Sequence, residues 1–236
     1  MSKRVLSFGG GVQTTAMAIL VAQGKIQADE VIFADTGAEK PETYWYMDSY
    51  TKPLFEELNI PFTTVQMEGG TLLDYCNRYR IIPSVVMRWC TDKSKIRPMN
   101  KYLNGETRLV GFSTDEVERA TRSKSTVNEY PLLELGYSYN DCEKTIMDYG
   151  WPMPLRSSCF FCTFQPWLEW NWLKREHPEL IAKCIEMENT YYTRRPETRL
   201  RVGLFGGKPL WMWVEGIQSE WEFPGEYSCY SGDCGH

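Results

Sequence analysis

The sequence predicts an α/β fold: a Rossmann-like, doubly wound, mainly parallel sheet of about five strands with helices on both faces. A short apolar run, Val5-Leu6-Ser7-Phe8, leads into three consecutive glycines and then into a helical pattern from Val12 to Gln23. A second strand and a second helix are expected in the same order, and this alternation is typical of parallel sheets. Such sheets bind ligands at the carboxyl ends of their strands.

The remaining elements follow from hydrophobic periodicity and turn residues, taken in chain order. Strands are expected at residues 30–34, 61–67, 107–111 and 130–135, and helices at residues 43–58, 140–149, 165–175 and 179–192. Trp211 and Trp213 alternate as in a strand with one buried face. We therefore expect an α/β domain over residues 1–151, and a helical, cysteine-containing cap over residues 152–236 that packs with it.

Composition narrows the classes of partner. The chain has 236 residues and a formal net charge of −5, which disfavours a general electrostatic grip on nucleic acid. A local basic groove could still form from Arg78, Arg80, Arg88, Lys93, Lys95, Arg97 and Lys101. No run approaches the roughly 20 apolar residues of a membrane-spanning helix, and the first residues contain no signal-peptide pattern. We expect a cytoplasmic protein with no membrane partner.

Cysteine usage points to metal or thiol chemistry. The chain has eight cysteines and two histidines. In a reducing compartment such a count indicates metal binding or reactive thiols rather than disulfides. Sulfur ligands favour zinc or an iron–sulfur cluster.

The glycine-rich segment suits a phosphate group. Glycine lets the backbone approach an anion closely, and the N-terminus of the following helix supplies N–H groups and partial positive charge. It is neither a kinase-type P-loop nor the dinucleotide fingerprint, because both spacings fail. A tight turn without a ligand is the alternative. The candidate phosphate-binding residues are Ser7, Gly9, Gly10, Gly11, Gln13 and Thr14.

This segment resembles the pyrophosphate loop of the phosphoadenosine phosphosulfate (PAPS) reductase and ATP-pyrophosphatase superfamily, Ser-x-Gly-Gly-x-Asp-Ser. Gln13 and Thr14 stand here where Asp-Ser is commoner. Further segments resemble the family in the right order over roughly residues 4–164. They are Phe33-Ala34-Asp35-Thr36-Gly37, Arg88-Trp89-Cys90-Thr91, Gly111-Phe112-Ser113 with Glu116 and Arg119, and Tyr130-Pro131-Leu132-Leu133.

The resemblance implies an adenine nucleotide, either ATP or a sulfonucleotide such as PAPS. Its adenosine pocket would involve Asp35, Thr36 and Gly37, and Lys95 would hold phosphate or sulfate oxygens. Gly111, Glu116 and Arg119 would also approach the nucleotide. Taken alone, each segment could equally be a turn, a basic helix face or an acidic helix start.

Cys159-Phe160-Phe161-Cys162 is a Cys-x-x-Cys pair that could hold one metal or act as a redox dithiol. The resemblance implies a [4Fe-4S] cluster on Cys90, Cys159 and Cys162, with zinc as the alternative. Thr91 stands where cluster-containing sulfonucleotide reductases have a second cysteine. The fourth ligand would be Cys142, or one iron would stay open. Cys142 could instead be a buried apolar thiol.

The C-terminal Asp233-Cys234-Gly235-His236 resembles the Glu-Cys-Gly-Leu-His tail of sulfonucleotide reductases, shortened by one residue. In that family the tail cysteine attacks the sulfur of the nucleotide, which makes Cys234 the candidate nucleophile and Cys229 its candidate resolving thiol. These two thiols could instead bind zinc or form a disulfide.

Three functions follow from these patterns. The first is PAPS reductase-like sulfur transfer with a thiol reductant such as thioredoxin. The second is ATP-dependent thiolation of a nucleic-acid base or backbone, using a sulfur donor; only here would nucleic acid be a partner. The third is a non-catalytic nucleotide sensor with structural zinc.

Overall fold

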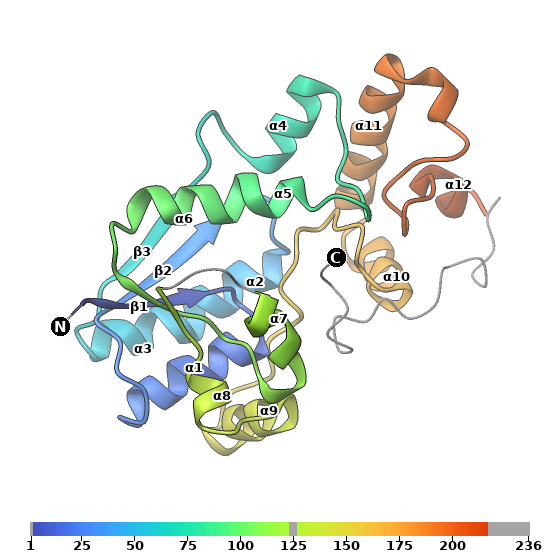
Figure 1. Cartoon of the computed structure of the whole chain (residues 1–236). Helices are drawn as coiled ribbons and strands as arrows, with labels where there is room; N and C mark the ends of the chain where they lie inside the picture. Colours follow the sequence, from blue (N-terminus) through green and yellow to red (C-terminus); the bar gives the residue numbers. More distant parts are fainter. Residues whose placement is uncertain (1, 123–126, 217–236) are drawn as a thin grey trace. The chain divides into compact units, whose positions relative to one another are not determined.

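The computed structural model describes residues 2–122 and 127–216 (Figure 1). By its internal contacts the chain forms two compact units whose segments alternate along the sequence. Unit 1 comprises the chain up to Asp35, Glu39–Gln66 and Ile96–Ser157. Unit 2 comprises Thr36–Ala38, Met67–Lys95 and the described chain from Ser158 onward. Cys229 and Cys234 lie outside the described residues.

Unit 1 holds one five-stranded sheet in which every pairing is parallel, in the order β3-β2-β1-β4-β5. The strands are β1 (Arg4–Phe8), β2 (Glu30–Asp35), β3 (Phe62–Gln66), β4 (Thr107–Leu109) and β5 (Asn128–Glu129). The predicted α/β fold class is confirmed. The chain leaves β1 toward β2 and β3 on one side, and β4 and β5 lie on the other, so the topological switch point lies between β1 and β4.

Helices cover both faces of this sheet (Figure 1). In unit 1 they are α1 (Val12–Ala22), α2 (Pro41–Tyr46), α3 (Lys52–Glu57), α6 (Arg97–Tyr102), α7 (Val117–Arg122), α8 (Pro131–Glu134) and α9 (Tyr139–Asp148). A π-helical segment, Met47–Thr51, joins α2 to α3, so the single helix expected at residues 43–58 has three parts.

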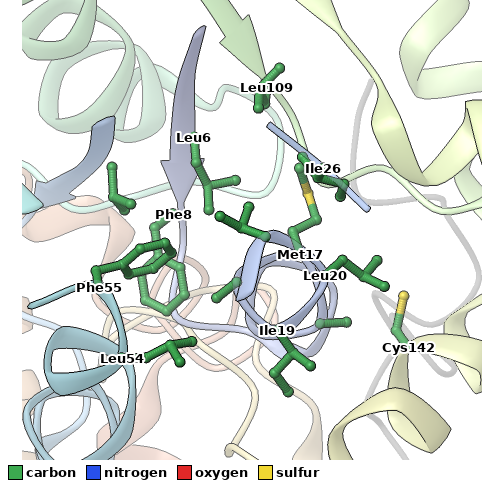
Figure 2. Packing of buried hydrophobic residues seen from close by; sticks show 14 of the residues in the cluster. Leu6, Phe8, Met17, Ile19, Leu20, Ile26, Leu54, Phe55, Leu109 and Cys142 are labelled. Carbon is green, nitrogen blue, oxygen red and sulfur yellow. The ribbon is translucent and has the colours of Figure 1, made fainter. Parts of the chain in front are cut away.

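Side chains of β1 alternate between the two faces, as the pleat requires. Leu6 and Phe8 pack into the apolar cluster that surrounds α1 (Figure 2). Between them, Ser7 donates a hydrogen bond to Met99 Sδ of α6 at 3.3 Å. In β2, Glu30 likewise accepts a hydrogen bond from the Tyr102 hydroxyl of α6 at 2.7 Å. The central strands are therefore buried on both faces.

One strand prediction of unit 1 is wrong. Residues 130–135 are not a strand: β5 ends at Glu129, and Pro131 begins the helix α8. Proline favours the first position of a helix because its missing N–H would have no intrahelical partner there. The apolar residues that suggested a strand, such as Leu132, are buried on one side of α8 instead.

Unit 2 is mainly helical, as expected for the C-terminal part. Its helices are α4 (Leu72–Tyr79), α5 (Trp89–Thr91), α10 (Trp167–Glu176), α11 (Pro178–Arg194) and α12 (Leu210–Val214). Trp211 and Trp213 lie on α12, so their assignment to a strand is wrong: Trp213 stacks on Phe205 at 4.7 Å, and a five-residue helix presents it as readily as a strand would. Within the described chain, no helix has both the length and the apolarity needed to span a bilayer.

The expected boundary between residues 151 and 152 stays a prediction, but the contacts group the chain differently. Residues 67–95 belong to unit 2 because α4 packs against α11, and Leu72 and Cys76 join the apolar cluster of the C-terminal helices. No periodicity within residues 67–95 signals this long-range pairing.

A buried carboxylate organises the end of unit 2. Glu188 of α11 is 0 % exposed and accepts hydrogen bonds from the N–H groups of Leu204 at 2.7 Å, Leu210 at 2.8 Å and Trp211 at 3.4 Å. Two of these donors open α12, where a helix N-terminus favours negative charge. An added Cβ at Gly203 would lie 2.4 Å from Glu188 Oε1, so this approach requires glycine.

Glu188 should make the stability of unit 2 depend on pH. Burial raises its pKa from 4.5 to about 7, against the opposing effect of its backbone donors. Unit 2 is therefore most stable below about pH 4.5, where Glu188 is protonated in both the folded and the unfolded chain. As pH rises to about 7, the free energy of unfolding falls by roughly 3 kcal/mol. Urea unfolding of wild type and Glu188→Gln should show this fall only in wild type. Equal pH slopes in the two proteins would contradict the assignment.

Candidate functional site

The glycine-rich loop lies at the carboxyl end of the central strand β1, beside the switch point. Gly11 is the N-cap of α1, with extended backbone and no side-chain capping bond. The first N–H groups of α1 therefore have no intrahelical partner and face the end of the sheet. Thr14 Oγ1 accepts a hydrogen bond from Gly9 N and donates one to Gly11 O, both at 3.2 Å. Its hydroxyl thus braces the loop.

Two glycines of the loop differ in what a side chain would meet. Gly10 has φ +78°, and a Cβ there would lie 2.8 Å from Thr43 Cγ2. A side chain at Gly10 would therefore strain the fold as well as any ligand site. At Gly9, in contrast, the one described atom within 4 Å of an added Cβ would be Thr14 Oγ1, at 3.9 Å. The described part of the chain therefore leaves the space in front of Gly9 open.

Thr43, near the start of α2, packs against this loop. Its Cγ2 methyl group faces Gly10, and the residue is 3 % exposed. Within residues 2–122 and 127–216, Thr43 Oγ1 has no hydrogen-bond partner. A buried hydroxyl without a partner costs free energy unless a ligand or water satisfies it. The loop, with the N–H groups of the first turn of α1, fits an anion such as a phosphate group. No local pattern in the sequence singles out Thr43, because its burial depends on tertiary packing.

The segment after β4 approaches the same loop. A Cβ at Gly111 would lie 3.0 Å from Thr14 Cγ2, so glycine permits the close packing of this segment against α1. Gln13 Nε2 donates to Glu116 Oε2 at 3.1 Å, and Glu116 also pairs with Arg119. The structure thus brings Gln13, Thr14, Gly111, Glu116 and Arg119 together around the start of α1.

Asp35 and Ser7 are occupied by structural bonds. Asp35 accepts hydrogen bonds from the Tyr44 hydroxyl at 2.6 Å and from Gln66 Nε2 at 2.8 Å. Burial, followed by this carboxylate, raises the pKa of Tyr44. Ser7 points to Met99, as described above. Both side chains therefore hold strand ends and helices in place.

Thr36 and Gly37 belong to unit 2. Thr36 contacts the Cys-x-x-Cys turn, and Gly37 packs against the start of α4. Cys159 Sγ donates to Thr36 Oγ1 at 3.4 Å, and Phe160 N donates to the Ala38 carbonyl at 2.9 Å. Gly37 has φ +65°, and a Cβ there would lie 2.4 Å from Thr71 Cγ2. Lys95 is half-buried and also belongs to unit 2.

The Cys159–Cys162 segment forms a tight turn that is anchored by the two residues between its cysteines. Phe160 and Phe161 are 5 % and 0 % exposed and pack in the apolar cluster of unit 2. Cys162 N donates to the Cys159 carbonyl at 2.9 Å, which closes the turn. Both cysteines remain half-buried, so the anchored turn leaves their thiols partly accessible.

Cys90 joins this turn from α5. The Arg88 guanidinium lies over the Phe164 ring at 5.4 Å, which places the Arg88–Cys90 segment beside the turn. Burial raises the pKa of the Cys90 thiol, and the neighbouring Cys162 raises it further. Unit 2 therefore brings Cys90, Cys159 and Cys162 into one region, although Cys90 is distant from the pair in sequence.

Three other cysteines are fully buried. Cys142 packs in the core of unit 1, next to Leu20 (Figure 2), and burial raises its pKa to about 12. This placement matches the apolar thiol that the sequence left open, and it puts Cys142 in a different unit from the other three candidate ligands. Cys76 and Cys184 are buried in unit 2, and burial followed by the neighbouring Cys90 raises the pKa of Cys76.

The donor set of unit 2 fits a thiolate-bound centre by its chemistry. Three partly accessible thiols are soft ligands of the type that zinc and iron–sulfur clusters prefer. The raised pKa of the Cys90 thiol is expected before a metal supplies the positive charge that deprotonates it. In the described part of the chain, no three His, Cys, Asp or Glu side chains converge closely enough to hold a single metal ion.

Comparison with known proteins gives a family. The sequence pattern of the phosphoadenosine phosphosulfate reductase domain matches residues 3–174. Two uncharacterized proteins of Methanocaldococcus jannaschii are also similar. MJ0973 is 25% identical over 201 residues, covering 77% of this chain and 46% of the relative. MJ0066 is 24% identical over 231 residues, covering 89% and 45%. The chain therefore spans about half the length of these curated relatives.

Among solved structures, the fold is similar to that of the U34-tRNA thiolase NcsA from Methanococcus maripaludis with its [4Fe-4S] cluster. The identity is 16%, the TM-score is 0.43, and the match covers 98% of this chain and 80% of NcsA.

Replacing Thr43 by Val should weaken nucleotide binding without destabilising the fold. The isosteric change removes a hydroxyl that has no partner in the described chain, so unfolding should be nearly unaffected. A hydrogen bond to a charged phosphate contributes about 1.5–3 kcal/mol, so affinity should fall roughly 10- to 100-fold. ATP, adenosine phosphosulfate and PAPS binding would be measured by calorimetry.

The matched control is Thr51→Val, because Thr51 Oγ1 is also buried and lacks a partner among the described residues. Thr51 lies on the π-helical segment after α2. Equal affinity losses in the two variants, or unchanged affinity in Thr43→Val, would exclude the loop as the phosphate site.

Proposed function

Because the chain belongs to the phosphoadenosine phosphosulfate reductase domain family, we propose that it is an adenine-nucleotide-dependent sulfur-transfer enzyme. The observation that carries the proposal is the glycine loop at the carboxyl end of β1, where Gly10 packs against the Thr43 methyl group and the Thr43 hydroxyl has no partner among the described residues. Phosphates would lie on the N–H groups of the loop and of the first turn of α1. Glu116, held by Gln13 and Arg119, would border this site.

Sulfur chemistry would belong to the thiols. Cys90, Cys159 and Cys162 would hold a metal centre, with a [4Fe-4S] cluster as the first candidate and zinc as the second. Such a centre, when bound, would supply positive charge and Lewis acidity to the sulfur chemistry. Phe160 and Phe161 would keep the turn rigid, because both are anchored in the core of unit 2.

The first candidate reaction is reduction of a sulfonucleotide. The thiolate of Cys234 would attack the sulfonyl sulfur, and the bond from sulfur to the phosphate oxygen would break, so that the adenosine phosphate leaves with the electron pair. A second thiol, from Cys229 or an external reductant such as thioredoxin, would attack the Cys234 sulfur and release sulfite. The sulfur gains two electrons, and two thiols are oxidised to a disulfide.

A second candidate is ATP-dependent thiolation of a nucleic acid. An acceptor oxygen would attack ATP and release pyrophosphate, and a sulfur donor would then displace AMP from the adenylated acceptor. The observation that favours this reaction is the concentration of basic residues in unit 2, where residues 75–95 contain five Lys or Arg and one acidic residue.

Product analysis should separate these reactions. Anaerobic protein would be incubated with adenosine phosphosulfate or PAPS plus a thiol reductant, or with ATP, a sulfide donor and RNA. For the first reaction we expect sulfite and adenosine phosphate, both lost in Cys234→Ser while nucleotide binding persists. Pyrophosphate and AMP that appear only with RNA would support the second. Gly9→Ala should abolish either activity. Nucleotide binding without turnover in every mixture would refute the enzyme and leave a sensor.

The metal should depend on the three thiols of unit 2 that are partly accessible. Serine replaces a thiolate ligand poorly, so Cys90→Ser, Cys159→Ser and Cys162→Ser should each lose most of the bound iron or zinc. Cys76→Ser and Cys142→Ser are the controls, because both thiols are fully buried among apolar side chains. Iron, zinc and acid-labile sulfide would be measured after anaerobic purification. Metal loss in Cys142→Ser equal to that in Cys159→Ser would overturn the ligand assignment.

A further inference from the structure

Basic charge is concentrated in two segments of unit 2. Residues 75–95 and 194–208 hold ten of the 26 Lys and Arg residues of the chain and two of its 31 Asp and Glu residues. The other 200 residues carry 16 basic and 29 acidic side chains. The protein is acidic as a whole, with a net charge of −5, but these two segments are strongly basic.

The fold joins these two segments. Helices α4 and α11 pack side by side (Figure 1), and Arg194 Nη1 donates a hydrogen bond to the Tyr79 carbonyl at 3.1 Å. The C-terminal ends of both helices therefore meet. Further along, a Cβ at Gly207 would lie 3.4 Å from Val85 Cγ2, so the second segment follows the first beyond the helix ends.

Seven cations of the joined segments are exposed. We name them, together with Tyr79, the arginine surface: Arg78, Arg80, Arg194, Arg195, Arg199, Arg201 and Lys208. The helix dipole accounts for Arg78 and Arg194, which lie in the last turns of α4 and α11. It does not account for the other five, which lie outside both helices. The acidic side chains nearest in sequence are Asp74, which interacts with Arg78, and Glu197.

An aromatic side chain is exposed among these cations. Tyr79 is 49 % exposed, and its ring lies 4.5 Å from that of Tyr75, which in turn lies 5.8 Å from Trp89. Lys93 Nζ sits 4.3 Å above the Tyr75 ring and donates to its hydroxyl at 2.7 Å. The Tyr75 ring, which Lys93 holds in place, therefore packs against the Tyr79 ring. A supported, exposed ring beside cations is the arrangement that stacks an unpaired base.

We propose that the arginine surface binds a single-stranded polynucleotide, with phosphodiester groups on the arginines and one base stacked on Tyr79. The inference deepens the second candidate of the proposed function, because it assigns the surface that would hold the acceptor. Guanidinium groups recognise phosphate oxygens through paired N–H donors. Backbone contacts of this kind carry no sequence information, so the surface positions a strand and does not select a sequence.

Salt-dependent binding tests the cations. Fluorescence anisotropy would follow 12-nucleotide RNA and DNA strands, the RNA duplex of equal length and inorganic polyphosphate, each over a range of salt concentrations. In Arg195→Ala/Arg201→Ala, the slope of log K against log salt should shrink by about 1.4, because each phosphate contact contributes about 0.7 for single strands. The matched control is Lys25→Ala/Lys144→Ala, which removes two exposed cations of unit 1.

Tyr79 tests the stacked base. Tyr79→Ala should weaken binding of single strands about tenfold, and Tyr79→Phe should retain it, because stacking needs the ring and not the hydroxyl. Equal affinity for polyphosphate or duplex, equal losses in the lysine control, or no effect of Tyr79→Ala would overturn the proposal. RNA and DNA arms identify which polynucleotide is bound.

The outcome is separable from the proposed function. Binding is measured without turnover, and adenine-nucleotide affinity is measured in the same variants. If wild type transfers sulfur but binds no strand, the arginine surface is rejected and the proposed function stands. Strand binding in a protein that turns over none of the nucleotides would support the surface and reject the enzyme.

Discussion

The position of β1 in the middle of the sheet is the constraint on which unit 1 depends. Its pairing with β2 on one side and β4 on the other fixes where the chain must turn into α1. Because α1 follows β1 in the chain, this turn lies at the carboxyl end of β1. Gly10, with φ +78° and Thr43 against it, makes that turn. The same requirement that closes the fold thus presents helix N–H groups at the switch point.

A similar relation between packing and chemistry governs the cysteine turn. Phe160 and Phe161 direct their rings into the core of unit 2, where they meet edge to face with centroids 4.9 Å apart. The two inner residues of the turn are buried, and its two outer residues are partly exposed. The apolar pair therefore sets the exposure of Cys159 and Cys162, and Arg88 over Phe164 aligns the segment of Cys90 with them.

Local patterns in the sequence were sufficient for the fold class, most helices and the glycine loop, because strand period, helix period and consecutive glycines are local signals. Pro131 and Trp211 were misread because short amphipathic segments fit both periods. The grouping of residues 67–95 with the C-terminal helices depends on the contact of α4 with α11, which no local pattern encodes. The burial of Cys142 and of the Thr43 hydroxyl likewise arises only from tertiary packing.

The departure of Gln13 from the family pattern has a structural counterpart. Its amide can donate, which a carboxylate cannot, and it donates to Glu116. Glu116 also pairs with Arg119, whose guanidinium lies 4.5 Å over the Phe112 ring, and that ring stacks on Tyr130 at 5.6 Å. A carboxylate at position 13 would face Glu116 as a like charge. With glutamine at position 13, the carboxylate of Glu116 can border the loop while Arg119 neutralises its charge. The N–H groups of α1 therefore keep their attraction for an anion.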